Sequence, residues 1–337
     1  MAPREVYLDN SATTKVDPRV TEAMLPYFSE KYGNPNSLHK FGREARAAID
    51  NARAQVASLI NAKPTDIIFT GAGSEADNLA IKGAAWALKE KGKGSHIITS
   101  AIEHHAILDT VRWLGKMGFE YTILPVDDKG FVSPADLEAA IRPDTILATI
   151  MFANNEIGTI QPVKELGEVC RRHGVMFHVD GVQAAGHIKV DVEQLPIDMM
   201  TMAAHKMYGP KGLGALYVRR GVKLIPTLHG GGQEFGLRSG TENVPGIVGF
   251  GVAAEIASFQ GYRSRTSREP QETPDCPSTR ALRSNISRER VCCFCSTRRA
   301  SPPPAVRPVP PAALSPATCC LLPDSTTPRR TVRCVSR

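Results

Sequence analysis

Cysteine is scarce in most of this chain: of eight cysteines in 337 residues, only Cys170 lies within the first 260. A long segment with one cysteine cannot be held by disulfides and is typical of a protein from a reducing compartment. The chain also has no apolar run of about 18 residues, so no membrane-spanning helix is predicted. The opening MAPREVYLDN contains neither a hydrophobic signal stretch nor an Arg-rich amphipathic presequence, and we expect a cytoplasmic protein.

Lysine is absent from residues 261–337, where 14 arginines and 5 acidic residues give a charge of +9. The first 260 residues carry −2, so the net charge of +7 predicts no nucleic-acid interface for them. Twelve prolines and many serines leave the last 77 residues without a helical or strand period. Such a composition cannot bury a core, and we predict that this segment is disordered.

The change of composition is abrupt, because it interrupts the apolar helical stretch VGFGVAAEIASFQ at Gln260. One hypothesis is a shift of reading frame in a GC-rich gene, which would yield Arg, Pro, Ser, Ala and Cys. The alternative is a genuine disordered arm in which CCFC forms a metal or redox site. That cluster has no second CxxC or His pair beside it, so we predict no metal site there.

Residues 64–220 alternate between strand and helix patterns, and Ser74 is the predicted N-cap of the first of these helices. The predicted strands are 66–70, 95–100, 120–126, 145–152, 175–180 and 198–204, with a possible antiparallel strand at 214–220. The predicted helices are 74–92, 106–118, 133–141 and 163–174, preceded by an amphipathic helix at 43–60. This alternation predicts an α/β fold with a mostly parallel sheet covered by helices on both faces.

Polar groups follow five of the predicted strands. The first strand leads into the Gly-rich turn GAGSEADN, whose N–H groups and Ser74 hydroxyl can hold a phosphate at a helix N-terminus. The other four strands are followed by His104 and His105, by Asn154, Asn155 and Glu156, by Asp180 and Gln183, and by His205 and Lys206. Because the carboxyl ends of parallel strands meet at one edge, the pattern predicts an active site there.

Lys206 follows the apolar run IDMMTM and precedes a Gly/Pro loop. A partly desolvated amine has a lowered pKa and can form a Schiff base with a carbonyl. The alternative interpretation is that the aliphatic part of the Lys206 side chain only carries the amine to solvent. Asp180 suits a protonated pyridine nitrogen, or else caps a helix over GVQAAG. Amine, carboxylate and phosphate-binding turn together match pyridoxal 5′-phosphate, whose aldehyde, ring nitrogen and phosphate need these groups.

Longer motifs carry a resemblance to a known family. They are YLDNSATT, YGNPNSLHKFGREA, DIIFTGAGSEADNLAIKG, EHHAI, NNEIGTIQP, HVDGVQAAGH, AAHKMYGPKGLGALYVR and HGGGQEFGLRSGTENV. Over residues 5–260 they resemble the cysteine desulfurases of the NifS/IscS kind, which are class-V, fold-type-I pyridoxal-phosphate enzymes. The resemblance implies an N-terminal segment at 1–15, a cofactor-binding large domain at 16–260, and an unrelated tail at 261–337 in place of a small C-terminal domain.

The resemblance also implies an activity and partners. The activity is removal of sulfur from L-cysteine, which gives L-alanine and an enzyme persulfide for iron–sulfur cluster assembly. The implied partners are a second copy of the chain and iron–sulfur scaffold or sulfur-acceptor proteins, with no nucleic acid and no membrane.

Roles for single residues follow from the same resemblance. Lys206 would hold the cofactor and move the α-proton of the substrate, His104 would stack on the ring and act as acid or base, and Asp180 would pair with the ring nitrogen. Thr241 would reach the phosphate of the neighbouring subunit. The remaining residues implied for cofactor binding are Gly73, Ser74, Asn155, Gln183 and His205.

Two features of the family are missing: a cysteine nucleophile on a mobile Ser/Gly-rich loop, and an arginine that grips the substrate carboxylate. The seven cysteines after residue 275 lie in Arg/Pro/Ser contexts, and Cys170 lies in a predicted helix, so none is assigned the role. We therefore expect cofactor binding with impaired turnover. The alternatives are a selenocysteine lyase or other class-V aminotransferase, and an inactive partner-binding module; the lack of GxGxxG disfavours a dinucleotide-binding domain.

Overall fold

The computed structural model describes residues 7–263. Helix α8 (Val244–Arg263) includes Gln260, the residue at which the composition of the sequence changes. The predictions of disorder and of no metal site at CCFC concern residues outside the described range. None of the described helices is both long and apolar enough to span a membrane.

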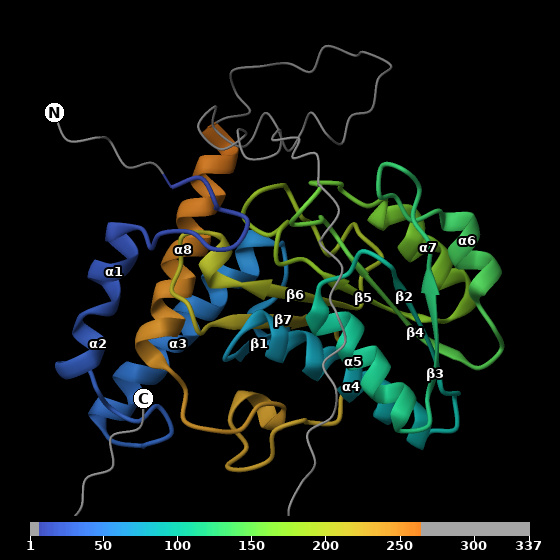
Figure 1. Ribbon diagram of the computed structural model, residues 1–337. Helices are drawn as coiled ribbons and strands as arrows, with labels where there is room; N and C mark the ends of the chain where they lie inside the picture. The colour runs from blue at the N-terminus through green and yellow to red at the C-terminus, as the bar shows by residue number, and fades with distance from the viewer. Residues whose placement is uncertain (1–6, 264–337) are drawn as a thin grey trace, which may run out of the picture. The chain divides into compact units, whose positions relative to one another are not determined.

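A single seven-stranded sheet forms the centre of the described chain (Figure 1), in the order β1-β7-β6-β5-β4-β2-β3. Its strands are β1 (Ile67–Thr70), β2 (His96–Ser100), β3 (Glu120–Leu124), β4 (Thr145–Met151), β5 (Met176–Asp180), β6 (Met199–Ala203) and β7 (Gly214–Val218). Strand β7 is antiparallel to both β1 and β6, and the other neighbouring pairs are parallel. The predicted mostly parallel sheet with an antiparallel strand at 214–220 is confirmed.

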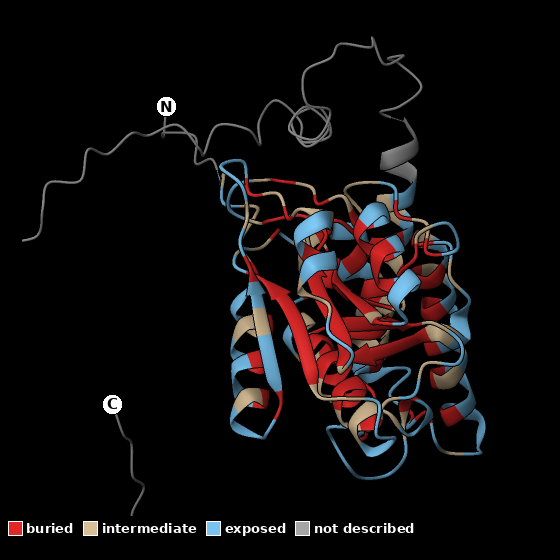
Figure 2. Cartoon of the chain, turned by 90° about the vertical axis from the view of Figure 1, so that its right-hand side faces the viewer, coloured by how far each residue is buried: buried red, intermediate tan, exposed pale blue. Residues whose placement is uncertain are grey.

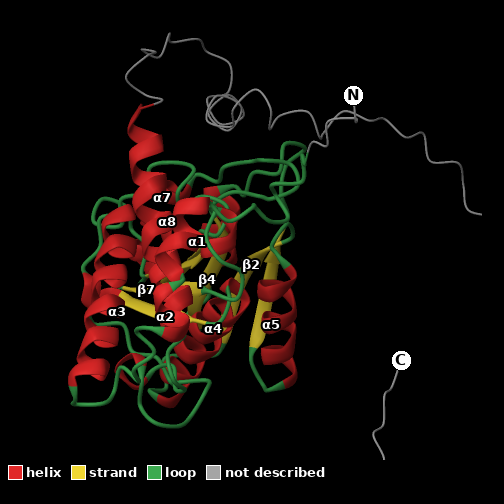
Figure 3. Ribbon diagram, turned by 90° about the vertical axis from the view of Figure 1, so that its left-hand side faces the viewer, coloured by secondary structure: helices red, strands yellow, loops and turns green. Residues whose placement is uncertain are grey.

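Helices cover both faces of this sheet, as predicted for buried parallel strands. The helices are α1 (Pro18–Met24), α2 (Pro26–Ser29), α3 (Lys40–Leu59), α4 (Gly73–Glu90), α5 (His105–Lys116), α6 (Pro134–Ala140), α7 (Val163–His173) and α8, with 3₁₀ turns η1 (Pro64–Asp66), η2 (Ala204–Lys206) and η3 (Glu234–Gly236). Helices α3, α6, α7 and α8 contribute to one apolar core, and α4 and α5 contribute to another on the opposite face. Figure 3 shows α1 and α2 beside α3 and α8.

Burial along the sheet explains the sequence patterns. Strands β4 and β6 are buried throughout and read as continuous apolar or β-branched runs, whereas β3 at the sheet edge is mostly exposed (Figure 2). The residues at two helix ends also act as their types predict. At the start of α6, the Ser133 hydroxyl accepts a hydrogen bond from the Asp136 N–H, and at the end of α7, Gly174 adopts the left-handed conformation with φ of 67°. These elements place the carboxyl ends of the parallel strands at one edge.

Candidate active site

Five strand ends converge on one edge of the sheet, where the polar residues predicted from the sequence follow them. Strands β2, β4, β5 and β6 run parallel, and β1 shares their direction because β7 opposes both β1 and β6. Their last residues are Thr70, Ser100, Met151, Asp180 and Ala203. The loops that leave these residues therefore bring widely separated parts of the sequence together.

Lys206 lies in η2, directly after β6, and is half-buried. Its Nζ donates to the backbone carbonyl oxygens of Ser11 and Ala12, the latter at 2.8 Å. Desolvation lowers the pKa of Lys206, while the carboxylates of Asp180 and Asp9 oppose that shift. The structure thus provides the partly desolvated amine that the sequence predicted, and the amine contacts backbone carbonyls rather than simply reaching solvent.

Asp180 ends β5 and is buried, with 6% of its surface exposed. Burial raises the pKa of Asp180, whereas a hydrogen bond from the Val182 N–H (3.0 Å) and the nearby charges of His104 and Lys206 lower it. The alternative of a helix N-cap is wrong, because residues 182–187 form turns rather than a helix. Asp180 therefore shares one electrostatic environment with Lys206 and His104.

His104 is the N-cap of α5 and is exposed. Its Nδ1 accepts a hydrogen bond from the Ala106 N–H at 3.1 Å, so the neutral ring carries its proton on Nε2. The neighbouring His105 faces Asp109 on the surface of α5, with Nδ1 3.9 Å from Oδ2. Of the two adjacent histidines, His104 is the one that lies within electrostatic range of Asp180.

The Gly-rich turn after β1 leads into α4, but its helix begins earlier than predicted. Ala72 is the N-cap and Gly73 the first helical residue, so the predicted cap at Ser74 is wrong, and Ser74 is exposed in the first turn. A Cβ on Gly73 would lie 3.1 Å from Val182 Cγ2 and 3.4 Å from the Ala203 Cβ. Glycine thus lets the helix N-terminus, a favourable place for an anion, approach the ends of β5 and β6.

Two further predicted residues, Gln183 and His205, contact the N-terminal segment. The Gln183 amide donates to the Ser11 carbonyl at 3.0 Å, the same oxygen that Lys206 contacts. His205 Nδ1 lies 3.1 Å from Thr13 Oγ1, and desolvation, with Lys206 and Lys211 nearby, lowers the pKa of His205. These contacts join the strand ends to the N-terminal segment.

Asn155 and Thr241 are less closely tied to this group. Asn155 is half-buried in the turn after β4, and it is its neighbour Asn154 that organises the turn by accepting hydrogen bonds from the N–H groups of Glu156 and Ile157. Thr241 is exposed in the loop before α8. Within residues 7–258, no hydrogen bond joins the Thr241 side chain to Lys206, Asp180 or His104, and its contact with a neighbouring subunit stays a prediction.

The sequence reasoning missed several residues at this edge. The carbonyls of Ser11 and Ala12 carry no side-chain signal, and their partner Lys206 lies more than 190 residues away in the chain. Asp77 and Glu103 are buried carboxyls in electrostatic contact with Asp180. Only their short distance from predicted residues in the sequence could have pointed to them.

Cys170 is fully buried in α7, and burial raises the pKa of its thiol to about 12. A thiol with this pKa is protonated at neutral pH and is a poor nucleophile. The prediction that Cys170 is a packed or surface residue without a catalytic role is consistent with this burial.

We expect the Cys170→Ala variant to show the same number of thiols reacting with Ellman's reagent in native buffer as the unsubstituted chain, because the Cys170 thiol is buried and protonated. In denaturant the variant should show one reactive thiol fewer. A loss of one reactive thiol already in native buffer would show that Cys170 is accessible, contrary to its burial.

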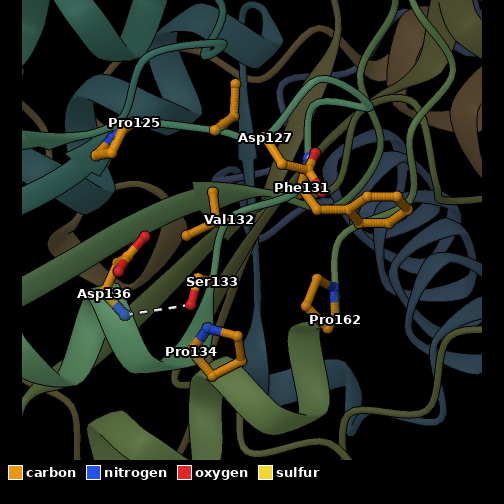
Figure 4. A pocket seen from close by; sticks show the side chains of 9 residues that line it. Pro125, Asp127, Phe131, Val132, Ser133, Pro134, Asp136 and Pro162 are labelled. Carbon is orange, nitrogen blue, oxygen red and sulfur yellow. Dashed lines mark hydrogen bonds between the residues drawn. The ribbon is translucent and has the colours of Figure 1, made fainter.

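A surface hollow lies away from these residues, between the end of β3 and the starts of α6 and α7 (Figure 4). It is lined by Pro125, Val126, Asp127, Phe131, Val132, Ser133, Pro134, Asp136 and Pro162. Its lining contains none of the residues predicted for the site and no lysine, histidine or cysteine. It therefore lacks the amine that marks the strand-end site.

Comparisons with known proteins agree with this arrangement. The family model described as aminotransferase class-V matches residues 6–275. Two curated relatives are cysteine desulfurase IscS of Dictyoglomus turgidum, 56% identical over 76% of this chain and 65% of its own length, and IscS of Methanosarcina thermophila, 56% identical over 76% and 63%. This chain thus spans slightly less than two thirds of these relatives.

Solved structures give the same result. A NifS-like protein aligns with a TM-score of 0.75 and 44% identity, covering 77% of this chain and 72% of its own. A structure described as SspA in complex with cysteine aligns with a TM-score of 0.72 and 42% identity, covering 78% and 77%. The family match over most of the sequence and these alignments show that the chain belongs to the class-V aminotransferases, among which it is similar to the NifS/IscS cysteine desulfurases.

Proposed function

We propose that this chain binds pyridoxal 5′-phosphate at the strand-end edge and acts on L-cysteine as a cysteine desulfurase, releasing L-alanine and passing the sulfur to a thiol. The observation that carries the proposal is the half-buried Lys206 amine within electrostatic range of the buried Asp180 carboxyl. The bound cofactor would supply an aldehyde for the substrate amine and a ring that accepts electrons.

The donor set fits that group. Lys206 has the lowered pKa that an amine needs to react with an aldehyde, and Asp180 supplies a buried negative charge for a protonated ring nitrogen. The start of α4 offers N–H groups at Gly73 and Ser74 to a phosphate. Asn155, Gln183 and His205 would complete the cofactor contacts, and Thr241 would contribute from the neighbouring subunit.

Two residues would move protons. The Lys206 amine would take the α-proton of the substrate. Its Nζ contacts backbone carbonyls rather than a carboxylate that would hold it as an ammonium ion, and its pKa is lowered. His104 carries its proton on Nε2, since Nδ1 caps α5, and can donate from that atom. Thr14 keeps η2 in place: its hydroxyl donates to the His205 carbonyl at 2.9 Å, which fixes the backbone beside Lys206.

The sulfur acceptor would be a thiol other than Cys170, whose proton is held by burial. We therefore propose that turnover by this chain is slow unless another thiol is supplied. Homodimer formation, a cytoplasmic location, and delivery of the sulfur to an iron–sulfur scaffold protein belong to the same proposal. The domain boundaries at residues 15 and 260 also stay proposals.

The test is to reconstitute the full chain with pyridoxal phosphate, add L-cysteine with dithiothreitol as an external thiol, and quantify alanine and sulfide. We expect a visible absorbance band from the bound cofactor and equal amounts of the two products. L-Selenocysteine and L-alanine with a 2-oxo acid serve as competing substrates. Failure to bind the cofactor, or product formation only from a competing substrate, would contradict the proposal.

A further inference from the structure

Two buried carboxyl groups lie close to Asp180. Asp77 is on α4 with 2% of its surface exposed, and Glu103 precedes α5 with 6% exposed. Each interacts electrostatically with Asp180, and Asp77 also interacts with Glu103. Glu103 Oε1 accepts a hydrogen bond from the N–H of Met151, which lies opposite Asp180 in the β4–β5 pairing, and Asp77 Oδ1 lies 3.8 Å from the ring of His178, two residues before Asp180. The three carboxyls therefore form a cluster, called here the buried acid cluster. Three carboxylates so placed cannot all stay ionised, because each charge raises the cost of the next.

Two basic side chains near the cluster, His104 and Lys206, act on Asp180 and lower its pKa. The main influences on the other two acids are burial, hydrogen-bond donors and the charges of other carboxylates, and burial is the largest for both. Asp180 is thus the member whose ionised form is best stabilised.

His178 on β5 looks like a cation for Asp77, because its Nε2 lies 3.8 Å from Asp77 Oδ1. Its ring nitrogens are instead engaged by hydroxyls, with Nδ1 2.8 Å from Thr149 Oγ1 and Nε2 3.1 Å from Thr201 Oγ1. Burial lowers the pKa of His178 to about 3, so the ring is neutral and forms no ion pair. Asp77 Oδ1 has no hydrogen-bond partner within residues 7–258.

Glu103 is held by one of its oxygens. Oε1 accepts hydrogen bonds from the Ser100 hydroxyl at 2.5 Å and from the Met151 N–H at 2.9 Å. Oε2 is buried without a hydrogen-bond partner in the described part of the chain, which suits an oxygen that carries a proton rather than a charge. Burial raises the pKa of Glu103 to about 8.

We propose that Asp77 and Glu103 are positioning residues that each hold a proton, so that the single negative charge of the buried acid cluster stays on Asp180. This rests on the proposed function, because that charge is what would pair with the ring nitrogen of the cofactor. Ionisation of Glu103 at higher pH would add a second negative charge beside Asp180. The cluster would then hold a ring-nitrogen proton more tightly as pH rises.

The first experiment needs no cofactor: infrared titration of the cofactor-free full chain from pH 6 to 10, followed through the C=O band of protonated carboxyls. The unsubstituted chain should show more of this band at pH 6 than either Glu103→Gln or Asp77→Asn. The difference in band intensity between the unsubstituted chain and Glu103→Gln is the contribution of Glu103. In the unsubstituted chain this contribution should disappear as the pH rises, with a midpoint near pH 8. The exposed matched controls Glu90→Gln and Asp50→Asn should leave the band unchanged.

The proposal is overturned if the band at pH 6 is the same in both amide variants as in the unsubstituted chain, or if Asp180→Asn removes it instead. The unsubstituted titration does not depend on how well a variant folds, and far-UV circular dichroism checks each variant. Because the cofactor is absent, this result stands whether or not the chain binds pyridoxal phosphate.

The second experiment follows the visible absorbance of the cofactor-loaded chain with pH. The unsubstituted chain should show a change of the band near pH 8 that Glu103→Gln lacks and Glu90→Gln keeps. Persistence of that change in Glu103→Gln would overturn the link between Glu103 and the cofactor. A chain that never acquires the visible band would count against the proposed function alone.

Discussion

The Lys206→Ala variant is expected to lose the visible absorbance band of bound pyridoxal phosphate and to exchange the α-hydrogen of L-cysteine or L-alanine with deuterated water about 10²–10⁴-fold more slowly. Both effects follow from the same amine, which would hold the cofactor and then take the α-proton. Exchange followed by NMR measures proton removal without requiring a thiol to accept sulfur. It therefore tests this half of the reaction even if complete turnover is slow.

Two control variants test whether the effect comes from the reactive amine of Lys206, from its positive charge, or from a change in its loop. Lys206→Arg keeps a positive charge beside Asp180 but cannot form a bond to the aldehyde, so it should behave like the alanine variant. Lys211→Ala removes an exposed lysine from the same Gly/Pro loop and should keep both the band and the exchange rate. Retention of the band in Lys206→Ala would mean that another amine, or no amine, holds the cofactor.

Much of the sheet, and the edge at which the candidate site lies, could be predicted because the relevant signals are local. Fully buried strands such as β4 and β6 read as apolar runs, and the polar residues Asp180 and Lys206 stand where β5 and β6 end. Parallel strands then bring those ends to one edge without further information. The start of α4 was misplaced because Ser74 is a favourable cap by residue type, whereas the structure uses Ala72 without a side-chain cap.

What could not be predicted depends on contacts between distant residues. Lys206 donates to the carbonyls of Ser11 and Ala12, which any residue type would provide. Asp77 has the sequence setting of an ordinary acidic residue in the first turns of a helix, and only the tertiary structure turns it toward the sheet and Asp180. The protonation of such a residue depends on burial and neighbours.

Another such long-range contact is the buried ion pair of Arg53 and Glu234, which joins α3 to η3. Arg53 lies in the apolar stripe of α3, and its Nη1 and Nη2 each lie 2.7 Å from an oxygen of Glu234. Nη1 also donates to the Ile67 carbonyl at 2.7 Å, and Glu234 Oε2 accepts from the Phe69 N–H at 2.8 Å. The pair thus fixes the η3 loop against β1.

The backbone of η3 shows why this contact matters. Glu234 and Phe235 have φ of 46° and 59°, in the left-handed region that disfavours residues other than glycine. The guanidinium of Arg53 also lies 4.9 Å and 5.2 Å from the ring centroids of Phe69 and Phe235. The ion pair and these ring contacts together hold the loop in a conformation that its own residues do not favour.

Arg53→Ala is expected to lower the free energy of unfolding by about 3–5 kcal/mol in urea denaturation, because it leaves the Glu234 carboxylate buried without its cation. Replacing both residues, as Arg53→Met with Glu234→Leu, should recover part of that loss, since no charge then remains buried. Arg142→Ala is the control: its bridges to Glu120 and Asp144 lie at the surface, with 41% of the Arg142 side chain exposed, and its loss should cost about 1 kcal/mol or less. An effect of Arg53→Ala no larger than that of Arg142→Ala would show that η3 is held by its own packing rather than by the ion pair.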